Sequence, residues 1–306
     1  MTLHISQSLQ TTFDGLHLER DALDEEVVEV EQPKPFVVHD GGYFAHDAQR
    51  RLIEVGTHAP AADSKSLAQR QLDAAAVDGA LRGFIEAGGF PCVGAKSAFV
   101  RGNYRLSIHG GLAEPRTLPA LCRNLQQYVG EVDNMTAGGK FATFVAVFRS
   151  QVIPSELAFE HLLWRQLQML HDACGKPWDD TVSSDPSNPH FSFSFGGRAF
   201  FIVGMHPRAS RVARRFCWPT LVFNLHEQFE QLREDGKMPR MQQVIRDRDR
   251  KLQGTINPNL RDFGDATEAR QYSGRPVEPS WTPPLVVDEP AADKPAARCP
   301  FHRTDA

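Results

Sequence analysis

Apolar side chains recur with helical spacing in several long stretches of the chain. The clearest stretch is residues 155–170, where Phe159, Leu163 and Leu167 fall on one face and Ser155 stands at a helix-starting position. Gly88-Gly89 ends an earlier and rougher apolar pattern. Periodicity and local start signals predict helices at residues 64–87, 115–129, 155–170, 227–233 and 241–252.

Shorter apolar runs between these helices are typical of strands. Residues 141–148 form a continuous apolar run, as in a strand buried on both faces. Residues 190–195 alternate strictly between polar and phenylalanine positions, and Gly196-Gly197 then predicts a two-residue hairpin turn. The full set of expected extended segments is 90–100, 104–108, 141–148, 190–195, 199–205 and 221–225.

Helices and strands alternate loosely around one strong hairpin, which favours an α+β fold with a mixed, largely antiparallel sheet flanked by helices. We expect a single main domain at residues 64–275. Residues 1–63 are predicted to be an N-terminal arm with short extended pieces; its acidic part, residues 24–31, fits a solvated arm or a short strand. Residues 276–306 read as a Pro-rich flexible tail.

The composition of the 306 residues, 41% hydrophobic and 24% charged, is that of an ordinary globular protein. A net charge of −4 gives no reason to expect nucleic acid or an anionic membrane as partner. We see no signal peptide and no apolar stretch near the ~20 residues that a membrane span needs. Five scattered cysteines without a Cys-x-x-Cys pair argue against a zinc ribbon or disulfide scaffold. These features predict a cytoplasmic protein, and a homo-oligomer is compatible with them.

The common catalytic signatures are absent from the sequence. It has no phosphate-binding loop, no dinucleotide-binding G-x-G-x-x-G after a strand, no G-x-S-x-G and no H-E-x-x-H. Kinases, Rossmann oxidoreductases, α/β-hydrolases and zinc proteases therefore lose support.

His206 is the most informative candidate, because it follows the apolar strand predicted at 199–205. A strand end fixes an imidazole well enough to bind a metal. Arg208, Arg211 and Arg214 follow closely, and arginines pair with carboxylates. A heme takes a histidine on its iron and arginines on its propionates. The competing interpretation is a hydrogen-bonded histidine beside a solvated basic loop.

Other side chains are weaker candidates. His171 and Cys92 are further possible cofactor ligands, although His171 also suits a helix C-terminus and Cys92 a buried structural thiol. His226 and Glu227 follow the strand at 221–225 and could bring a carboxylate to a cationic substrate. Cys299 lies in the tail, where thiolate ligation of heme is chemically feasible.

Several local motifs together resemble the YqcI/YcgG family over residues 89–281. They include Phe90-Pro91-Cys92, Trp164-Arg165-Gln166-Leu167, Asp185-Pro186 and Gly204-Met205-His206-Pro207. The remaining matches are His190 to Gly197, Phe223 to Phe229, Ile245 to Asp249, Asn257-Pro258 and Ala269 to Tyr272. The chain looks most like the branch that holds heme-dependent guanidine N-hydroxylases, such as those of cycloserine and guanitoxin biosynthesis. It departs from that branch where a Pro/Ala-rich insert separates Trp281 from Cys299.

The resemblance implies heme b as cofactor, dioxygen or peroxide as oxidant, an electron donor or reductase as partner, and a small guanidine-type substrate. His206 is the expected iron ligand. A planar guanidinium is best held by a carboxylate, for which Glu227 and Asp185 are candidates. Trp178, Phe191 and Phe193 could wall the heme. The alternatives are a heme- or ligand-binding sensor without turnover and a cofactor-free structural protein.

Overall fold

The computed structural model of the chain describes residues 41–57, 67–261 and 263–287. The acidic segment at 24–31 and Cys299 lie outside these residues. No helix in the described ranges is long and apolar enough to cross a membrane.

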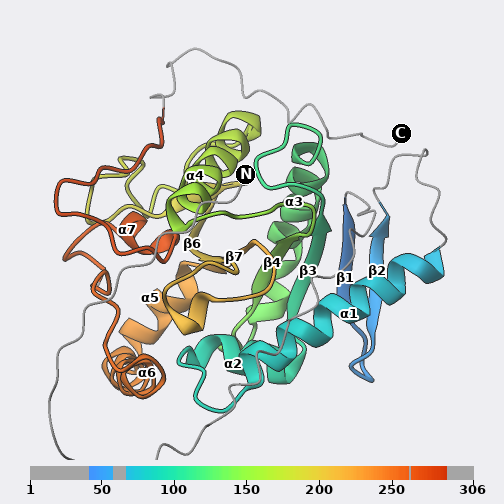
Figure 1. Cartoon of the computed structure of the whole chain (residues 1–306), viewed down its shortest axis with the longest axis horizontal. Coiled ribbons are helices and arrows are strands. Elements are labelled where there is room, and N and C mark those ends of the chain that lie inside the picture. Colours follow the sequence, from blue (N-terminus) through green and yellow to red (C-terminus); the bar gives the residue numbers. More distant parts are fainter. Residues whose placement is uncertain (1–40, 58–66, 262, 288–306) are drawn as a thin grey trace, which may run out of the picture. The chain divides into compact units, whose positions relative to one another are not determined.

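One seven-stranded sheet organises the described residues (Figure 1), with the strand order β2-β1-β3-β4-β7-β6-β5. Only β3 and β4 pair in parallel, and the other neighbours are antiparallel. The predicted α+β class with a mixed, largely antiparallel sheet is therefore confirmed. The strands are β1 Gly42–His46, β2 Leu52–Thr57, β3 Tyr104–His109, β4 Thr143–Phe148, β5 Phe193–Phe195, β6 Arg198–Met205 and β7 Thr220–Leu225.

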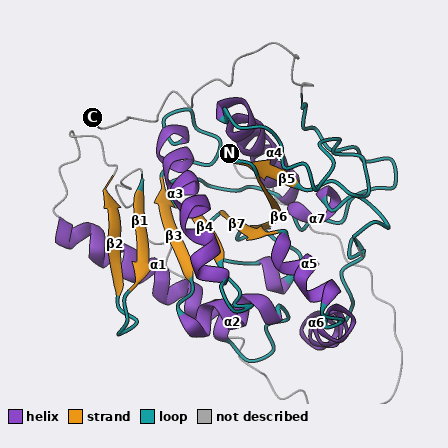
Figure 2. Cartoon of the chain, turned by 180° about the vertical axis from the view of Figure 1, so that it is seen from behind, coloured by secondary structure: helices purple, strands orange, loops and turns teal. Residues whose placement is uncertain are grey.

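Helices cover both faces of the sheet. Helix α1 passes in front of the strands in Figure 1, whereas α3 does so in the reversed view of Figure 2. Helices α3 and α4 contribute to one hydrophobic core, and α1 and α2 to a second. The helices are α1 Leu67–Glu86, α2 Val93–Arg101, α3 Leu118–Thr136, α4 Glu156–Ala173, α5 Glu227–Glu234, α6 Met238–Gln253 and α7 Ala269–Tyr272, with a 3₁₀ turn at Val212–Arg214.

The central strand β4 shows how the sequence separates the two cores. Phe144, Ala146 and Phe148 pack with α3 and α4, while Val145 and Val147 pack with α1 and α2. Successive side chains on a strand point to opposite faces, so a strand covered on both faces must be apolar throughout. The continuous apolar run at 141–148 predicted this strand correctly.

The hairpin between β5 and β6 is also confirmed. Phe195 pairs with Arg198, and the two residues between them, Gly196 and Gly197, have φ values of 66° and 80°. Two consecutive positive φ values define the turn type that suits a two-residue hairpin, and glycine adopts them without steric cost.

The extended stretch predicted at 90–100 is wrong, because residues 93–101 form helix α2. Cys92 caps this helix, its Sγ accepting a hydrogen bond from the amide of Ala95 at 3.4 Å. Gly102 ends it in the left-handed conformation, with a φ of 64°. A short helix built on such caps carries little apolar periodicity, so the sequence pattern did not reveal it.

Both predicted domain boundaries need to move outward. The predicted arm includes residues 41–57, yet this range contains β1 and β2 of the sheet, and Tyr43 is completely buried. Residues 276–287 have no regular structure but pack against α4: Leu285 is buried, and the Trp281 indole donates to Glu160 Oε1 at 3.1 Å. This part of the predicted tail belongs to the domain.

Candidate functional site

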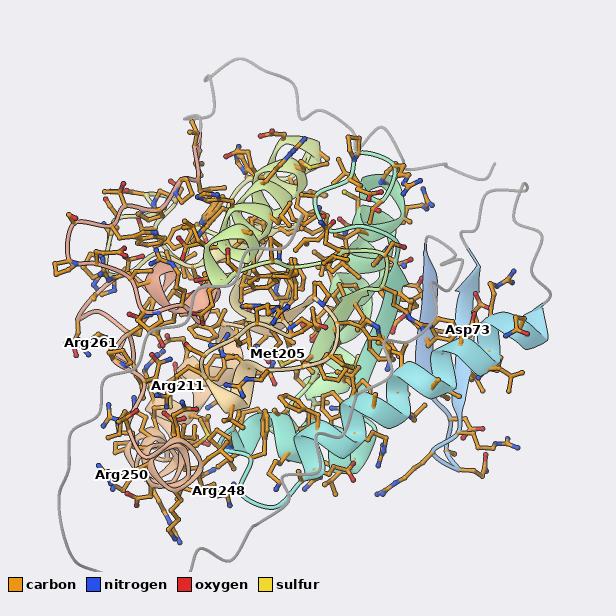
Figure 3. The ribbon with its side chains drawn as sticks, viewed as in Figure 1. Asp73, Met205, Arg211, Arg248, Arg250 and Arg261 are labelled. Atoms are coloured by element: carbon orange, nitrogen blue, oxygen red, sulfur yellow. The ribbon has the colours of Figure 1, made fainter. Side chains whose placement is uncertain are left out.

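A cavity of about 280 Å³ opens on the face of the sheet that α1 and α2 cover. Its floor consists of apolar side chains from the central strands, namely Val145, Val203, Met205 and Val222. Helices α2 and α6 and the loop from 257 to 268 form the walls. In Figure 3, Arg211 is drawn between Met205 on the sheet and helix α6. A mainly apolar cavity with a few convergent polar groups is the usual form of a small-molecule site.

Cys92 lies in the cavity wall at the N-terminus of α2. Burial raises the pKa of its thiol, whereas the α2 amides and the charges of Arg214 and Arg248 act in the opposite direction. Helix N-termini and nearby arginines stabilise a thiolate, which is the form that binds metals. The site thus contains one soft donor in a partly cationic setting.

Arg214 is a cation in the cavity wall that donates to three backbone carbonyls. It donates to Gly204 at 2.9 Å, to Gln271 at 3.2 Å and to Tyr272 at 3.4 Å. Burial lowers its pKa to about 10, so it stays charged at neutral pH. Arg214 is partly buried, and among the described residues it bonds only to carbonyl oxygens, so its charge stays available to an anion.

Arg211, in contrast, is neutralised within the protein. It forms a buried ion pair with Asp249 of α6 at 2.5 Å and also donates to the carbonyl of Thr255 at 2.8 Å. Asp249 accepts a further hydrogen bond from the amide of Asn257 at 2.9 Å. Both charged partners line the cavity, so this pair joins the end of β6 to the wall formed by α6.

Glu268 is a second acidic group in the wall, and it is 5% exposed. Its Oε1 accepts hydrogen bonds from the hydroxyls of Ser192 at 2.7 Å and Tyr272 at 2.6 Å. Burial raises the pKa of the carboxyl to about 8, against the opposing effect of the two hydroxyls. Glu268 therefore titrates near neutral pH, which is characteristic of functional groups.

His226 is a further titratable side chain in the wall. Its Nε2 lies 2.9 Å from Glu230 Oε1, and its ring is 4.7 Å from that of Phe263. Burial lowers the pKa of His226, against the opposing effect of the Glu230 carboxylate. The lining as a whole is cationic, because Arg211, Arg214, Arg233, Arg246 and Arg261 outnumber Asp249 and Glu268.

His206 does not belong to this cavity. Met205 faces the cavity, so the next residue along the strand faces the opposite core. The His206 ring stacks on Phe159 of α4 with 4.2 Å between centroids, and it is fully buried. A heme held in this cavity would therefore not have His206 as its iron ligand, contrary to the prediction.

Four other predicted site residues also lie elsewhere. Glu227 is exposed and bridges to Arg198 at 2.8 Å, and Asp185 is exposed and bonds to Ser187 within its own turn. Arg208 is exposed in the loop after β6, and His171 contacts Trp178 at the end of α4. Phe191, Phe193 and Trp178 pack in the core with α4 rather than around the cavity.

The cavity thus unites Cys92, Arg211, Arg214 and His226 from the predicted set, and adds two carboxylates that the sequence did not single out. Asp249 ends a motif noted at 245–249, and Glu268 precedes the motif at 269–272. These neighbouring motifs were the available signal for them. In the described ranges no group of three or more His, Cys, Asp or Glu side chains could hold a metal ion.

The greater part of the described residues is similar to known proteins. The family model described as YqcI/YcgG family matches residues 81–286, more than half of the chain. The uncharacterized protein YcgG of Bacillus subtilis is 29% identical over 224 residues, covering 69% of this chain and 80% of YcgG. The uncharacterized protein YqcI of the same organism is 29% identical over 195 residues, covering 60% and 74%. No solved structure matches the chain. The cavity, its arginines and Cys92 all fall within the matched residues, and the chain belongs to the YqcI/YcgG family.

Proposed function

We propose that this protein is a heme-dependent N-hydroxylase that adds one oxygen atom to a guanidine nitrogen of a small metabolite, such as an arginine derivative or a cyclic guanidine. The observation that carries the proposal is the shared location of Cys92 and the arginines on the wall of one apolar cavity. The resemblance of the chain to heme-dependent N-hydroxylases supplies the reaction class.

The residues present fit a heme. A porphyrin needs an apolar surface, an axial ligand and cations for its propionates. The sheet face offers the first, the Cys92 thiol the second, and Arg214 the third. A thiol that coordinates a metal is deprotonated outright, so the raised pKa of Cys92 is no obstacle. Cys92 thereby takes the role that the sequence had suggested for His206.

Bound heme would supply the activation of dioxygen, a step for which protein side chains have no suitable chemistry. The overall reaction consumes dioxygen, two electrons and two protons; one oxygen atom converts N–H to N–OH and the other leaves as water. An external electron donor must provide the electrons. The chain itself provides a cavity whose apolar floor limits access of water to the reacting nitrogen.

The absorption spectrum of protein purified from heme-replete cells tests the cofactor. We expect a Soret band, and a further shift with carbon monoxide after reduction that is typical of thiolate ligation. Cys92→Ser should abolish the thiolate signature. The matched control is Cys217→Ser, since Cys217 is exposed and outside the cavity. A colourless wild-type preparation would contradict the proposal.

Product analysis tests the reaction. L-arginine and agmatine should gain one oxygen atom by mass when reductant and dioxygen are supplied. Bound heme without any oxygenated product from a panel of guanidines would point to the sensor alternative instead.

A further inference from the structure

Glu268 is held in the cavity wall in a way that leaves one oxygen atom available. Both neighbouring hydroxyls, Ser192 Oγ and Tyr272 OH, donate to Oε1. Oε2 accepts no hydrogen bond from the described residues, and the cation that acts on this carboxyl, Arg233, does so without a hydrogen bond to it. The position of Oε1 is thus fixed while Oε2 remains free.

A purely structural role explains this arrangement poorly. Burying a carboxylate is costly unless a cation or several donors compensate it. Asp249 in the same wall has such compensation from Arg211 and the Asn257 amide, but Glu268 has only two neutral hydroxyls on one oxygen. Glu268 therefore holds a proton at neutral pH, and a cation that arrives from the cavity would supply the compensation that its ionised form lacks.

We propose that Glu268 is the carboxylate that binds the guanidinium or amidinium group of the ligand, through N–H donors directed at Oε2. The inference rests on the proposed function for the class of substrate, and it assigns the residue that selects for it. Charge-assisted hydrogen bonds in an apolar wall are stronger than in water and favour a planar cation over its neutral isostere. Ser192 and Tyr272 are positioning residues, since they fix the carboxyl without facing the ligand.

The groups around Glu268 determine how the binding of a cation should depend on pH. Tyr272 lies one turn along α7, Ser192 approaches from the segment before β5, and Arg233 and Glu230 act from α5 with opposite signs. Arg261 lines the same cavity from the 257–268 loop. In this setting the pKa of Glu268 is about 8, so the carboxyl is mostly protonated at pH 7. Binding a cation requires the ionised form and must therefore release a proton.

Isothermal titration calorimetry with agmatine, L-arginine and L-citrulline between about pH 6 and pH 9 tests the inference. In the wild type we expect agmatine affinity to rise with pH until about pH 8 and then level off, with release of one proton. L-citrulline, which carries a neutral urea, should bind at least ~10-fold more weakly than L-arginine. Glu268→Gln should lower agmatine affinity by ~10-fold or more at high pH and remove the pH dependence.

Glu234→Gln is the charge-matched control, because Glu234 is exposed on α5 and lies outside the cavity lining. It should leave the binding curve unchanged. Unaltered agmatine affinity and pH dependence in Glu268→Gln would overturn the inference.

Ser192→Ala provides a second route that keeps the carboxyl in place. The Ser192 hydroxyl lowers the pKa of Glu268, so its loss should shift the midpoint of the agmatine binding profile to higher pH, with near wild-type affinity above it. An unshifted profile in Ser192→Ala counts against the inference even if Glu268→Gln does not fold.

The Soret band of the same preparations reports on the heme separately. A colourless protein with pH-linked agmatine binding would refute the heme proposal alone, and a heme protein with pH-independent binding would refute the role of Glu268 alone.

Discussion

The imidazole of His206 lies against the ring of Phe159, with 26° between the ring planes and 4.2 Å between centroids. Neither ring nitrogen of His206 has a hydrogen-bond partner among the described residues. Burial lowers the pKa of His206 to about 4, so the ring is neutral in the folded protein. The contact joins the end of β6 to α4 and keeps this histidine away from the cavity.

His206→Leu should therefore make the protein less sensitive to acid. Between about pH 6.5 and pH 4 the histidine takes up a proton only in the unfolded chain, so wild-type stability falls as the pH falls through this window. The loss attributable to His206 is on the order of 2–3 kcal/mol, and leucine, of similar volume, has no proton to take up. Urea unfolding at about pH 7.5 and pH 4.5 measures the difference.

The same variant separates His206 from the cofactor. If Cys92 holds the heme, His206→Leu keeps the Soret band of the wild type, whereas loss of that band would return His206 to the position of iron ligand. An equal acid-induced loss of stability in variant and wild type would contradict the titration argument.

Gly204 provides a steric prediction at the same end of β6. A Cβ at this position would lie 2.6 Å from a ring carbon of Phe159 and 2.8 Å from both Leu163 Cδ1 and the Tyr272 carbonyl oxygen. The backbone oxygen cannot move aside cheaply, so Gly204→Ala should lower the free energy of unfolding by ~1–3 kcal/mol. Gly83→Ala is the matched control: nothing lies within 4 Å of its Cβ, and alanine should stabilise helix α1 by about 0.5–1 kcal/mol. Thermal unfolding of both variants should give shifts of opposite sign.

The fold was predictable where a short stretch of sequence determines the local structure. The site was predictable only in part. The apolar run of β4 and the Gly196-Gly197 turn each determine their structure within a few residues. Strand periodicity also states that Met205 and His206 face opposite sides, but not which side holds a cavity, since that depends on distant helices. Glu268 becomes notable only when Ser192 and Tyr272 converge on it, and the first of these is 76 residues away.

Glu268→Gln should change the pH dependence of stability in the opposite direction to His206→Leu. The pKa of this carboxyl is raised from 4.5 to about 8 on folding. Between these values only the folded protein binds the proton, so wild-type stability falls as the pH rises, by up to several kcal/mol. The variant lacks this term and should become more stable relative to the wild type from about pH 5 to pH 8. Urea unfolding across that range, with Glu234→Gln as control, measures the difference in the free energy of unfolding between variant and wild type. A difference that does not change with pH would mean that the carboxyl is ionised throughout, and would contradict the prediction.

The buried pair of Arg211 and Asp249 should couple strongly. Their side chains are 7% and 10% exposed, so Asp249→Ala leaves an uncompensated buried charge and should cost about 3–5 kcal/mol. Combining Asp249→Leu with Arg211→Met removes both charges. The double variant should lose less stability than the sum of the losses of the two single variants. The exposed pair of Asp247 and Arg250 on the same helix is the control, where Asp247→Ala should cost less than about 1 kcal/mol. A double-mutant cycle by urea unfolding gives the coupling energy, and a value near zero would mean that water reaches this wall of the cavity and screens the pair.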